Sequence, residues 1–317
     1  MTIESVDMPP LQTPAAFNTF HQNFKTENDK KDMKRIGFVL MIIVLGTALM
    51  LSCSKDDTVN YTEGKGKVNI YLTDAPFPIN LVSKTVVTID KVEIRKQESD
   101  TTGAEFITLT DEPMEVDLLT LSNGVTELLA SVELEAGSYD QIRMHVSESS
   151  VYMNDDTKFD LKVPSGSSSG LKIKIEPAIE ISEGQNADVL LDFDVSKSFV
   201  AKGNWKKGNI IGFNFKPVIR CVLLDMAGRI EGTVLDTANT ALEHASVKVW
   251  METEEMTDSL ITSAFTSPDG KYQIIGILAG NYYMTTELDS FTTDTVFNVS
   301  VTAGESTQVD FMLTPEP

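Results

Sequence analysis

The sequence predicts an all-β protein built from two antiparallel β-sandwich domains in tandem. Hydrophobic residues alternate with a period of two in many short stretches, and glycine, proline and aspartate turns separate these stretches. The clearest alternations in the first half are Val68, Ile70 and Leu72, then Ile142, Met144 and Val146, then Leu171, Ile173 and Ile175. Only residues 118–129 suit a short helix, and Gly124 weakens that pattern. Many short strands with almost no helix indicate sandwiches.

Two further strands are expected between residues 189 and 217. Their inward positions are Val189, Leu191, Phe193 and Val195 in one strand, and Ile211, Phe213 and Phe215 in the next. Pro217 has no amide hydrogen to donate to a ladder, so it ends the second strand or places it at an edge. These strands complete a first domain over residues 67–224.

A second sandwich is expected over residues 225–317. Its predicted strands are centred on Ile230 to Val234, Val247 and Val249, Tyr272 to Ile274, Tyr282 to Met284, Phe297 to Val301, and Val309 to Leu313. A turn over residues 267–270 separates the second of these from the third. Residues 136–139 and 279–282 share the pattern Ala-Gly-X-Tyr, in which glycine permits a turn and tyrosine begins a strand. We therefore expect similar construction in both domains.

Residues 33–52 predict a cleaved lipoprotein signal peptide. Lys34 and Arg35 precede a mainly apolar run over residues 36–51, and Ser52 precedes Cys53. At about 1.5 Å per residue this run reaches about 24 Å, short of the roughly 30 Å that a spanning helix must cross. The alternative is a chance cysteine after a short transmembrane helix. Residues 50–53 resemble the bacterial lipobox, with methionine at its outer position, which implies that the Cys53 thiol carries lipid.

Four residues after the lipidation site predict the location of the protein in the cell envelope. Ser54, Lys55, Asp56 and Asp57 resemble the lysine-plus-acidic export signal of Bacteroidota lipoproteins. The resemblance implies a lipid-anchored protein on the extracellular face of the outer membrane. Residues 53–66 are then a lipidated, flexible tether. Residues 1–32 show no periodicity and are interpreted as a mis-assigned start or a disordered extension.

Composition restricts the partners. The chain has a formal net charge of −21, and residues 1–52 carry five acidic and five basic side chains, so the mature chain keeps the whole surplus. Such a surface repels phosphate backbones, which disfavours nucleic acid as a partner. The chain has two cysteines, and Cys53 is predicted to be lipidated. Cys221 therefore lacks a partner for an intramolecular disulfide.

Both domains resemble known families. The second domain matches in residues 232–234, 245–247, 266–272 and 278–282, and it is similar to carboxypeptidase regulatory-like domains. That resemblance implies a small transthyretin-like or Ig-like sandwich of the carbohydrate-binding-like fold group, an accessory module without an active site. The first domain matches in residues 72–76, 117–121, 137–143, 163–166, 170–172 and 191–194, and it resembles the lipoprotein family called domain of unknown function 4382. Membership of that family implies a fold and a location in the cell envelope, but no biochemical activity.

No catalytic set is predicted. Residues 166–170 formally match a nucleophile elbow around Ser168, but no helical pattern follows them. His145 and His244 are isolated, so a triad or a histidine-based zinc site lacks members. We therefore expect no enzymatic activity and no cofactor. A hydrolase that uses Ser168 or the pair Asp192 and Asp194 is the least favoured alternative.

Asp192 and Asp194 are the weak candidates for a metal site. They lie two residues apart on a predicted strand, so both carboxylates project from the face opposite Phe193. Calcium would need a third oxygen donor such as Asp188 or Asp74. The alternative is ion pairing of these carboxylates with Lys197, Arg143 or Arg220. No twelve-residue calcium loop is present, so no metal is assigned.

Trp205, Lys206 and Lys207 are the candidate ligand-binding residues, since they combine an aromatic ring with cations at a predicted hairpin tip. Trp250 is expected at the contact between the two domains. Five triplets resemble the Bacteroidota acceptor pattern for O-glycosylation: residues 57–59, 100–102, 236–238, 258–260 and 294–296.

The sequence as a whole predicts a non-enzymatic, lipid-anchored protein of the cell envelope that acts as a binding, adhesion or accessory module. The expected partners are the membrane, through the lipid, and a surface protein or a glycan. The alternative is a carbohydrate-binding lipoprotein that uses Trp205. The oligomeric state is left open.

Overall fold

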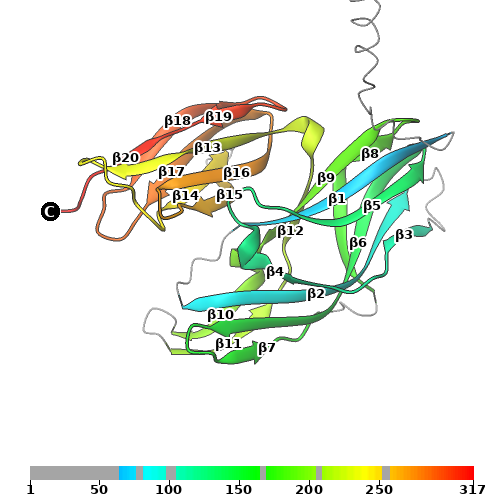
Figure 1. Cartoon of the computed structure of the whole chain (residues 1–317), viewed down its shortest axis with the longest axis horizontal. Coiled ribbons are helices and arrows are strands. Elements are labelled where there is room, and N and C mark those ends of the chain that lie inside the picture. The colour runs from blue at the N-terminus through cyan, green and yellow to red at the C-terminus, as the bar shows by residue number, and fades with distance from the viewer. Residues whose placement is uncertain (1–63, 76–80, 98–104, 165–168, 205–208, 252–257) are drawn as a thin grey trace, which may run out of the picture. The chain divides into compact units, whose positions relative to one another are not determined.

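The computed structural model describes residues 64–75, 81–97, 105–164, 169–204, 209–251 and 258–317 (Figure 1). Its secondary structure is almost entirely strand, which confirms the predicted all-β class. Two sandwich domains follow one another, and residues 60–317 form one compact unit. Within the described ranges, no helix is both long and apolar enough to cross a membrane. The predicted signal peptide and the residues Cys53, Ser54, Lys55, Asp56 and Asp57 lie outside the described residues.

One sheet of the first domain has four strands in the order β12, β9, β1, β5. Their bounds are Lys65–Ala75 for β1, Glu127–Glu135 for β5, Asn186–Asp194 for β9 and Ile219–Leu223 for β12. β1 pairs with β9 in parallel, and the other two pairings are antiparallel. The sheet therefore departs from a purely antiparallel arrangement at its centre.

The second sheet of the first domain is built around β2 and β6, which pair along nearly their whole lengths. The strands are β2 (Val82–Lys96), β3 (Phe106–Thr110), β4 (Met114–Asp117), β6 (Gly137–Met153), β7 (Lys158–Asp160) and β8 (Leu171–Ile181). A separate two-stranded sheet pairs β10 (Phe199–Asn204) antiparallel with β11 (Asn209–Phe215). Pro217 falls between β11 and β12, so the predicted strand end is confirmed.

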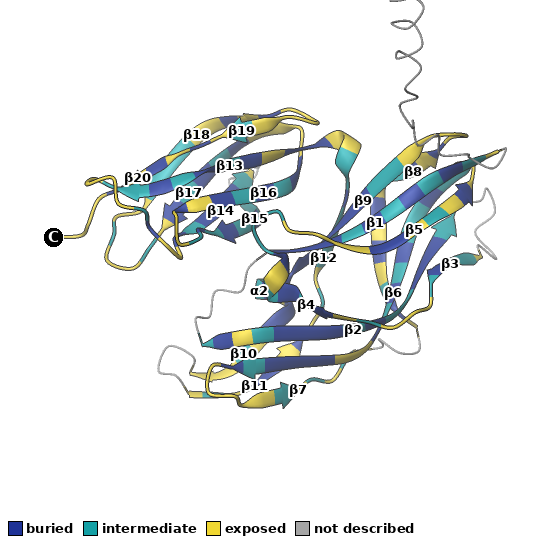
Figure 2. Ribbon diagram, viewed as in Figure 1, coloured by how far each residue is buried: buried dark blue, intermediate teal, exposed yellow. Residues whose placement is uncertain are grey.

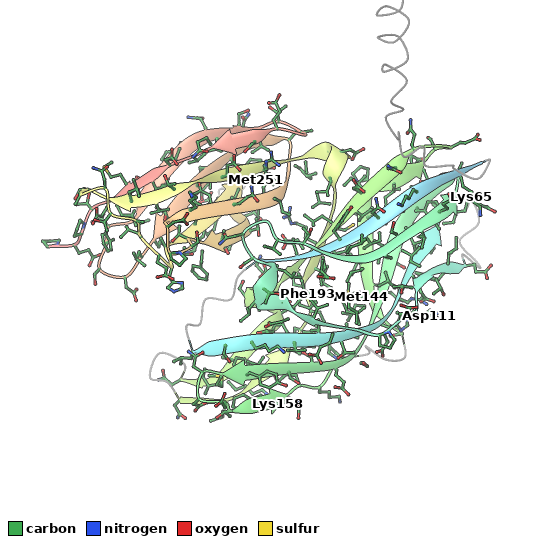
Figure 3. All side chains as sticks on the ribbon, in the orientation of Figure 1. Lys65, Asp111, Met144, Lys158, Phe193 and Met251 are labelled. Atoms are coloured by element: carbon green, nitrogen blue, oxygen red, sulfur yellow. The ribbon has the colours of Figure 1, made fainter. Side chains whose placement is uncertain are left out.

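The core of the first domain lies between these sheets because alternate residues of each strand face inward. Met144 from β6 and Phe193 from β9 are both fully buried there (Figure 3), and buried positions recur along the strands of both sheets (Figure 2). The predicted inward residues of β1, Val68, Ile70 and Leu72, are likewise completely buried. The alternation read from the sequence therefore identified the core of this domain.

The second domain is a smaller sandwich with its own core. One sheet contains β13 (Ala227–Asp236), flanked by β16 (Lys271–Leu278) and by the short parallel partners β19 (Ser306–Gln308) and β20 (Phe311–Leu313). The other sheet has the order β15 (Ser259–Phe265), β14 (Ser246–Met251), β17 (Gly280–Glu287) and β18 (Asp294–Val301). The expected turn at 267–270 closes with a 2.8 Å hydrogen bond from the Gly270 amide to the Ser267 carbonyl.

The repeated Ala-Gly-X-Tyr pattern forms the same tyrosine corner in both domains. The Tyr139 hydroxyl donates to the Glu135 carbonyl at 2.9 Å, and the Tyr282 hydroxyl donates to the Leu278 carbonyl at 2.8 Å. Each acceptor lies four residues before its tyrosine, and both rings are buried. Similar construction of the two domains is therefore visible at this level.

Three positions depart from the expected alternation. β9 ends at Asp194, whose carboxylate caps the short helix α2 (Val195–Ser198), so Val195 is helical although buried. Ile211 is 70% exposed because a register shift between Lys202 and Gly203 interrupts its hairpin. Phe297 is 67% exposed because β18 has an irregular register opposite Tyr283. A bulge reverses the face that a strand residue occupies.

The expected helix over 118–129 is much shorter in the structure. A 3-10 helix, η1, covers Leu118–Leu121, and the Asp117 carboxylate accepts the Leu119 amide at its start. Residues 127–129 belong to β5 instead. A second 3-10 turn, η3 (Leu224–Met226), connects the two domains.

Candidate functional site

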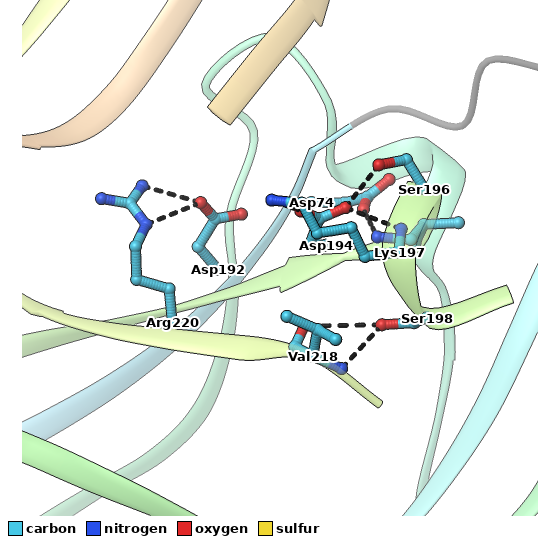
Figure 4. A network of polar contacts seen from close by, with 9 residues as sticks. Asp74, Asp192, Asp194, Ser196, Lys197, Ser198, Val218 and Arg220 are labelled. Atoms are coloured by element: carbon cyan, nitrogen blue, oxygen red, sulfur yellow. Dashed lines mark hydrogen bonds and ion pairs between the residues drawn. The ribbon is translucent and has the colours of Figure 1, made fainter. Parts of the chain in front are cut away.

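The Asp192 carboxylate is occupied by an ion pair rather than by a shared cation site (Figure 4). Its Oδ2 atom accepts from Arg220 Nε at 3.2 Å and from Arg220 Nη2 at 2.7 Å. The Arg220 Nη1 atom donates in turn to the Gly276 carbonyl of β16 at 2.7 Å. Arg220 therefore joins a buried carboxylate of the first domain to the backbone of the second.

Asp194 has a different task from Asp192. Its Oδ1 atom accepts from the Ser196 hydroxyl at 2.6 Å and from the Lys197 amide at 2.9 Å. Its Oδ2 atom pairs with Lys197 Nζ at 2.8 Å. The two carboxylates thus take the ion-pair alternative, with Arg220 and Lys197 as partners. Within the described ranges, no three His, Cys, Asp or Glu side chains are grouped so that they could hold a metal ion.

The two suggested third donors, Asp74 and Asp188, are also engaged. Asp188 accepts from Asn69 Nδ2 at 2.7 Å. Asp74 is buried, and its Oδ1 atom accepts from the Val195 amide at 3.2 Å, while its Oδ2 atom has no partner. Burial raises the pKa of Asp74 well above its usual range, and the nearby charges of Asp192 and Asp194 raise it further. This environment favours the protonated carboxyl group.

His145 belongs to an ion cluster on β2 and β6 that surrounds the buried Glu93. Its Nε2 atom lies 2.9 Å from Glu93 Oε2, and Glu93 also pairs with Lys91 at 2.6 Å and with Arg143 at 3.5 Å. The Arg143 guanidinium stacks on the Phe106 ring, 3.5 Å from its centroid. These contacts stabilise a charged Glu93 and give His145 a structural partner.

His244 is not brought together with His145. His244 is exposed in the second domain, where its backbone φ is 61°. Ser168 lies outside the described residues, as do Trp205, Lys206 and Lys207. The strands that flank the latter three, β10 and β11, pair antiparallel. The role of Trp205, Lys206 and Lys207 in ligand binding stays a prediction.

A row of aromatic rings that was not predicted from the sequence lies on the outer face of the sheet β15-β14-β17-β18. The aromatic row consists of Trp250 of β14, Tyr283 of β17 and Phe297 of β18. The Trp250 and Tyr283 rings lie 6.1 Å apart at an interplanar angle of 6°, and the Tyr283 and Phe297 rings lie 5.7 Å apart at 30°. Their neighbours Val249, Tyr282 and Met284 point into the core. The row therefore crosses three adjacent strands on the face opposite the core.

Polar side chains run beside the aromatic row on the same face. The Trp250 indole Nε1 donates to Thr285 Oγ1 at 2.9 Å, which fixes the ring on the sheet. Thr285 is paired in register with Lys248, and Lys248 Nζ lies 2.5 Å from Glu287 Oε2. The face thus combines an apolar stripe with a stripe of hydrogen-bonding groups.

Trp250 was expected at the contact between the domains, but its ring and its indole nitrogen have partners in its own sheet. A small apolar cluster lies between the two domains instead, where Ile275 of β16 packs against Leu190, Val222 and Ala227. Gly276 of β16 has a φ of 69°, and a Cβ on it would lie 2.6 Å from Leu190. A glycine at this position lets the strand approach Leu190 closely.

Comparison with solved structures gives distant similarity alone. A putative carbohydrate binding protein from Bacteroides uniformis is 21% identical over 28% of this chain and 41% of its own, with a TM-score of 0.23. The 3-chlorocatechol 1,2-dioxygenase of Rhodococcus opacus is 9% identical over 28% and 59%, with a TM-score of 0.22. The Bacillus anthracis TIE protein is 14% identical over 80% and 34%, with a TM-score of 0.23.

The aligned regions span less than two thirds of the first solved chains in this comparison. Among curated proteins no match was found. Two family models do match, and their ranges follow the two sandwiches seen in the structure. Residues 65–217 are therefore a domain of the family described as domain of unknown function (DUF4382), and residues 229–314 are a carboxypeptidase regulatory-like domain.

Proposed function

We propose that this protein is a lipid-anchored, non-enzymatic binding protein of the bacterial cell envelope, displayed on the outer face of the outer membrane. The observation that carries this proposal is the order of the chain: a basic pair, an apolar run and Ser52-Cys53, then a polar tether and two β-sandwiches. A carboxypeptidase regulatory-like domain at the C-terminal end supports a role as an accessory or adhesion module.

The chain offers a matched control for lipidation, because it has two cysteines. Burial raises the pKa of the Cys221 thiol to about 12, so that thiol is a poor nucleophile. Cells that express the wild type, Cys53→Ser or Cys221→Ser are grown with a clickable palmitate analogue. We expect label on the wild type and on Cys221→Ser, and none on Cys53→Ser. Label that persists on Cys53→Ser overturns the anchor.

Display at the surface needs a separate measurement. Protease treatment of intact cells is expected to digest the wild-type protein. Replacement of Lys55, Asp56 and Asp57 by alanine is expected to protect it while the lipid label stays. Protection of the wild type in intact cells, with digestion only after lysis, would place the protein on an inner leaflet and contradict the proposed display.

A further inference from the structure

We propose that the aromatic row of Trp250, Tyr283 and Phe297 is a binding platform for a neutral oligosaccharide. This inference rests on the proposed function as a binding protein, and it names the ligand class and the site. It also moves the site from Trp205, in the first domain, to the outer face of the second. Four observations carry it: the ring geometry, the exposure of Phe297, the adjacent polar stripe and the charge of the domain.

The geometry of the row suits a sugar chain. Neighbouring rings on β14, β17 and β18 are separated by 6.1 and 5.7 Å, a spacing on the scale of single sugar units. Aromatic faces offer broad apolar surface with few rotatable bonds, so little conformational entropy is lost when a ligand binds. Pyranose rings with equatorial hydroxyl groups present their axial C–H bonds as a flat apolar face. That face matches a row of rings.

The second observation is the exposure of the Phe297 side chain. This ring is 67% exposed at the edge strand of the sheet, next to two half-buried rings. It reaches that face because Asn298 has a left-handed backbone with φ of 59° and the register with β17 shifts there. Contiguous exposed apolar surface bordered by polar groups is typical of a binding site. A bulge that turns a large ring out of the core fits such a use.

The polar stripe supplies directional contacts. Lys248 and Glu287 lie beside the row, held together at 2.5 Å, and Thr285 accepts from the Trp250 indole. An ion pair of this kind presents donors and acceptors to ligand hydroxyl groups without a net charge. The pair is also fixed before binding, so less side-chain entropy is lost when a ligand is bound.

Charge decides between neutral and anionic glycans. Residues 225–317 carry three basic side chains, Arg229, Lys248 and Lys271, against fifteen acidic ones. Lys248, the cation beside the row, is already neutralised by Glu287. A sulfated or uronic acid polymer would therefore meet repulsion without a compensating cation. The ligand class that fits is a neutral oligosaccharide.

The test uses the full-length lipidated protein in detergent and an array of neutral gluco-, xylo- and manno-oligosaccharides, with heparin as the anionic arm. Binding is quantified by titration with the best neutral probe. We expect Phe297→Ala to weaken the association constant about tenfold and Trp250→Ala to weaken it more. Trp250→Phe, which keeps a ring face, should retain most of the affinity. Phe106→Ala, in the first domain, and Trp205→Ala are the matched aromatic controls and should bind as the wild type does.

Each outcome has a definite meaning. Thermal unfolding of Phe297→Ala distinguishes a loss of binding from a loss of folding. We expect an unchanged unfolding temperature, because this ring is largely exposed. Wild-type affinity in both Phe297→Ala and Trp250→Ala overturns the platform, as does binding of heparin alone or of no probe. Loss of binding in Trp205→Ala alone would return the site to the first domain. If the wild type is a dimer and Phe297→Ala is a monomer, the aromatic row is a self-association surface instead. The palmitate labelling of Cys53 is independent of all these results, so failure of the platform leaves the anchor intact.

Discussion

The two sandwiches share a tyrosine corner but differ in what they bury. Among the described residues, the first domain buries the carboxylates Asp74, Glu93, Asp192 and Asp194, whereas the buried polar side chains of the second are the three threonines Thr262, Thr266 and Thr286. Buried charges need partners, and the first domain supplies Arg220, Lys197, Lys91 and His145. The second domain relies on neutral hydrogen bonds such as Tyr272 to the Val309 carbonyl at 2.6 Å.

This difference teaches that one architecture can be stabilised in two electrostatic regimes. The stability of the first domain depends on ion pairs and therefore on pH. The second domain is more acidic over its whole sequence, yet among its described residues no charged side chain is buried, so water screens those charges. The following substitutions test this contrast.

The largest effect is expected from Arg220→Ala in the first domain. This change leaves Asp192 buried without its cation and removes the donor to the Gly276 carbonyl. Removing one partner of a buried ion pair costs about 3 kcal/mol of unfolding free energy. Urea unfolding followed by circular dichroism measures the loss. The control is Lys271→Ala, whose pair with Asp269 is well exposed, and it should change stability by less than about 1 kcal/mol. Equal effects would contradict the contrast.

Asp74→Asn should stabilise the first domain at pH 8. The pKa of Asp74 is raised in the folded state by burial and by Asp192, so the native protein binds this proton more tightly than the unfolded chain does. Its contribution to stability is therefore present at low pH and is lost as pH rises through the folded pKa. Asparagine keeps an acceptor for the Val195 amide without the buried charge, and we expect a gain of about 1 kcal/mol. Urea unfolding at pH 5 and pH 8 checks this result.

Glu93→Gln supplies the control of opposite sign. Burial raises the Glu93 pKa, but hydrogen bonds from Lys91 and His145 lower it more, so the net folded-state pKa is lowered. Its contribution is thus present above the unfolded pKa and is lost as pH falls through the folded one. Glu93→Gln should destabilise the protein at neutral pH. Parallel pH profiles for the two variants would break the electrostatic explanation.

The tyrosine corners should respond alike in the two domains. Tyr139→Phe and Tyr282→Phe each remove one hydroxyl that donates to a carbonyl four residues earlier. A neutral hydrogen bond of this kind contributes about 1 kcal/mol. Urea unfolding with hydrogen exchange, which assigns each loss to its domain, measures both. A loss confined to one domain would show that the shared pattern does not have a shared energetic role.

The fold was predictable where alternation is strict, because a period of two places Ile70, Met144 and Val247 in a core without any tertiary information. The predicted alternation is wrong at Ile211 and Phe297, where a bulge shifts the register. Bulges depend on which strand lies alongside, which the local sequence does not show. The parallel pairing of β1 with β9 is also non-local, as it joins residues more than a hundred positions apart.

The candidate sites divide in the same way. Arg220 and Lys197 were among the predicted partners of Asp192 and Asp194, because strand spacing and charge restrict the choices. The aromatic row was missed because Trp250, Tyr283 and Phe297 come from three strands and meet only through the pairing of β14, β17 and β18. The outward position of Trp250 was a usable signal. Its two neighbours in the row required the register.

The smallest effect is expected from Asn298→Gly, and its comparison with Asn298→Ala links stability to the aromatic row. Its φ of 59° lies in the left-handed region, where glycine and asparagine are tolerated and alanine is strained. Asn298→Gly should change the unfolding free energy by less than about 0.5 kcal/mol, whereas Asn298→Ala should lower it by about 1 kcal/mol. Urea unfolding of both variants measures the difference. If alanine is as stable as glycine, the backbone at Asn298 has left the left-handed region, and the bulge that directs Phe297 outward is not fixed by the sequence at this position.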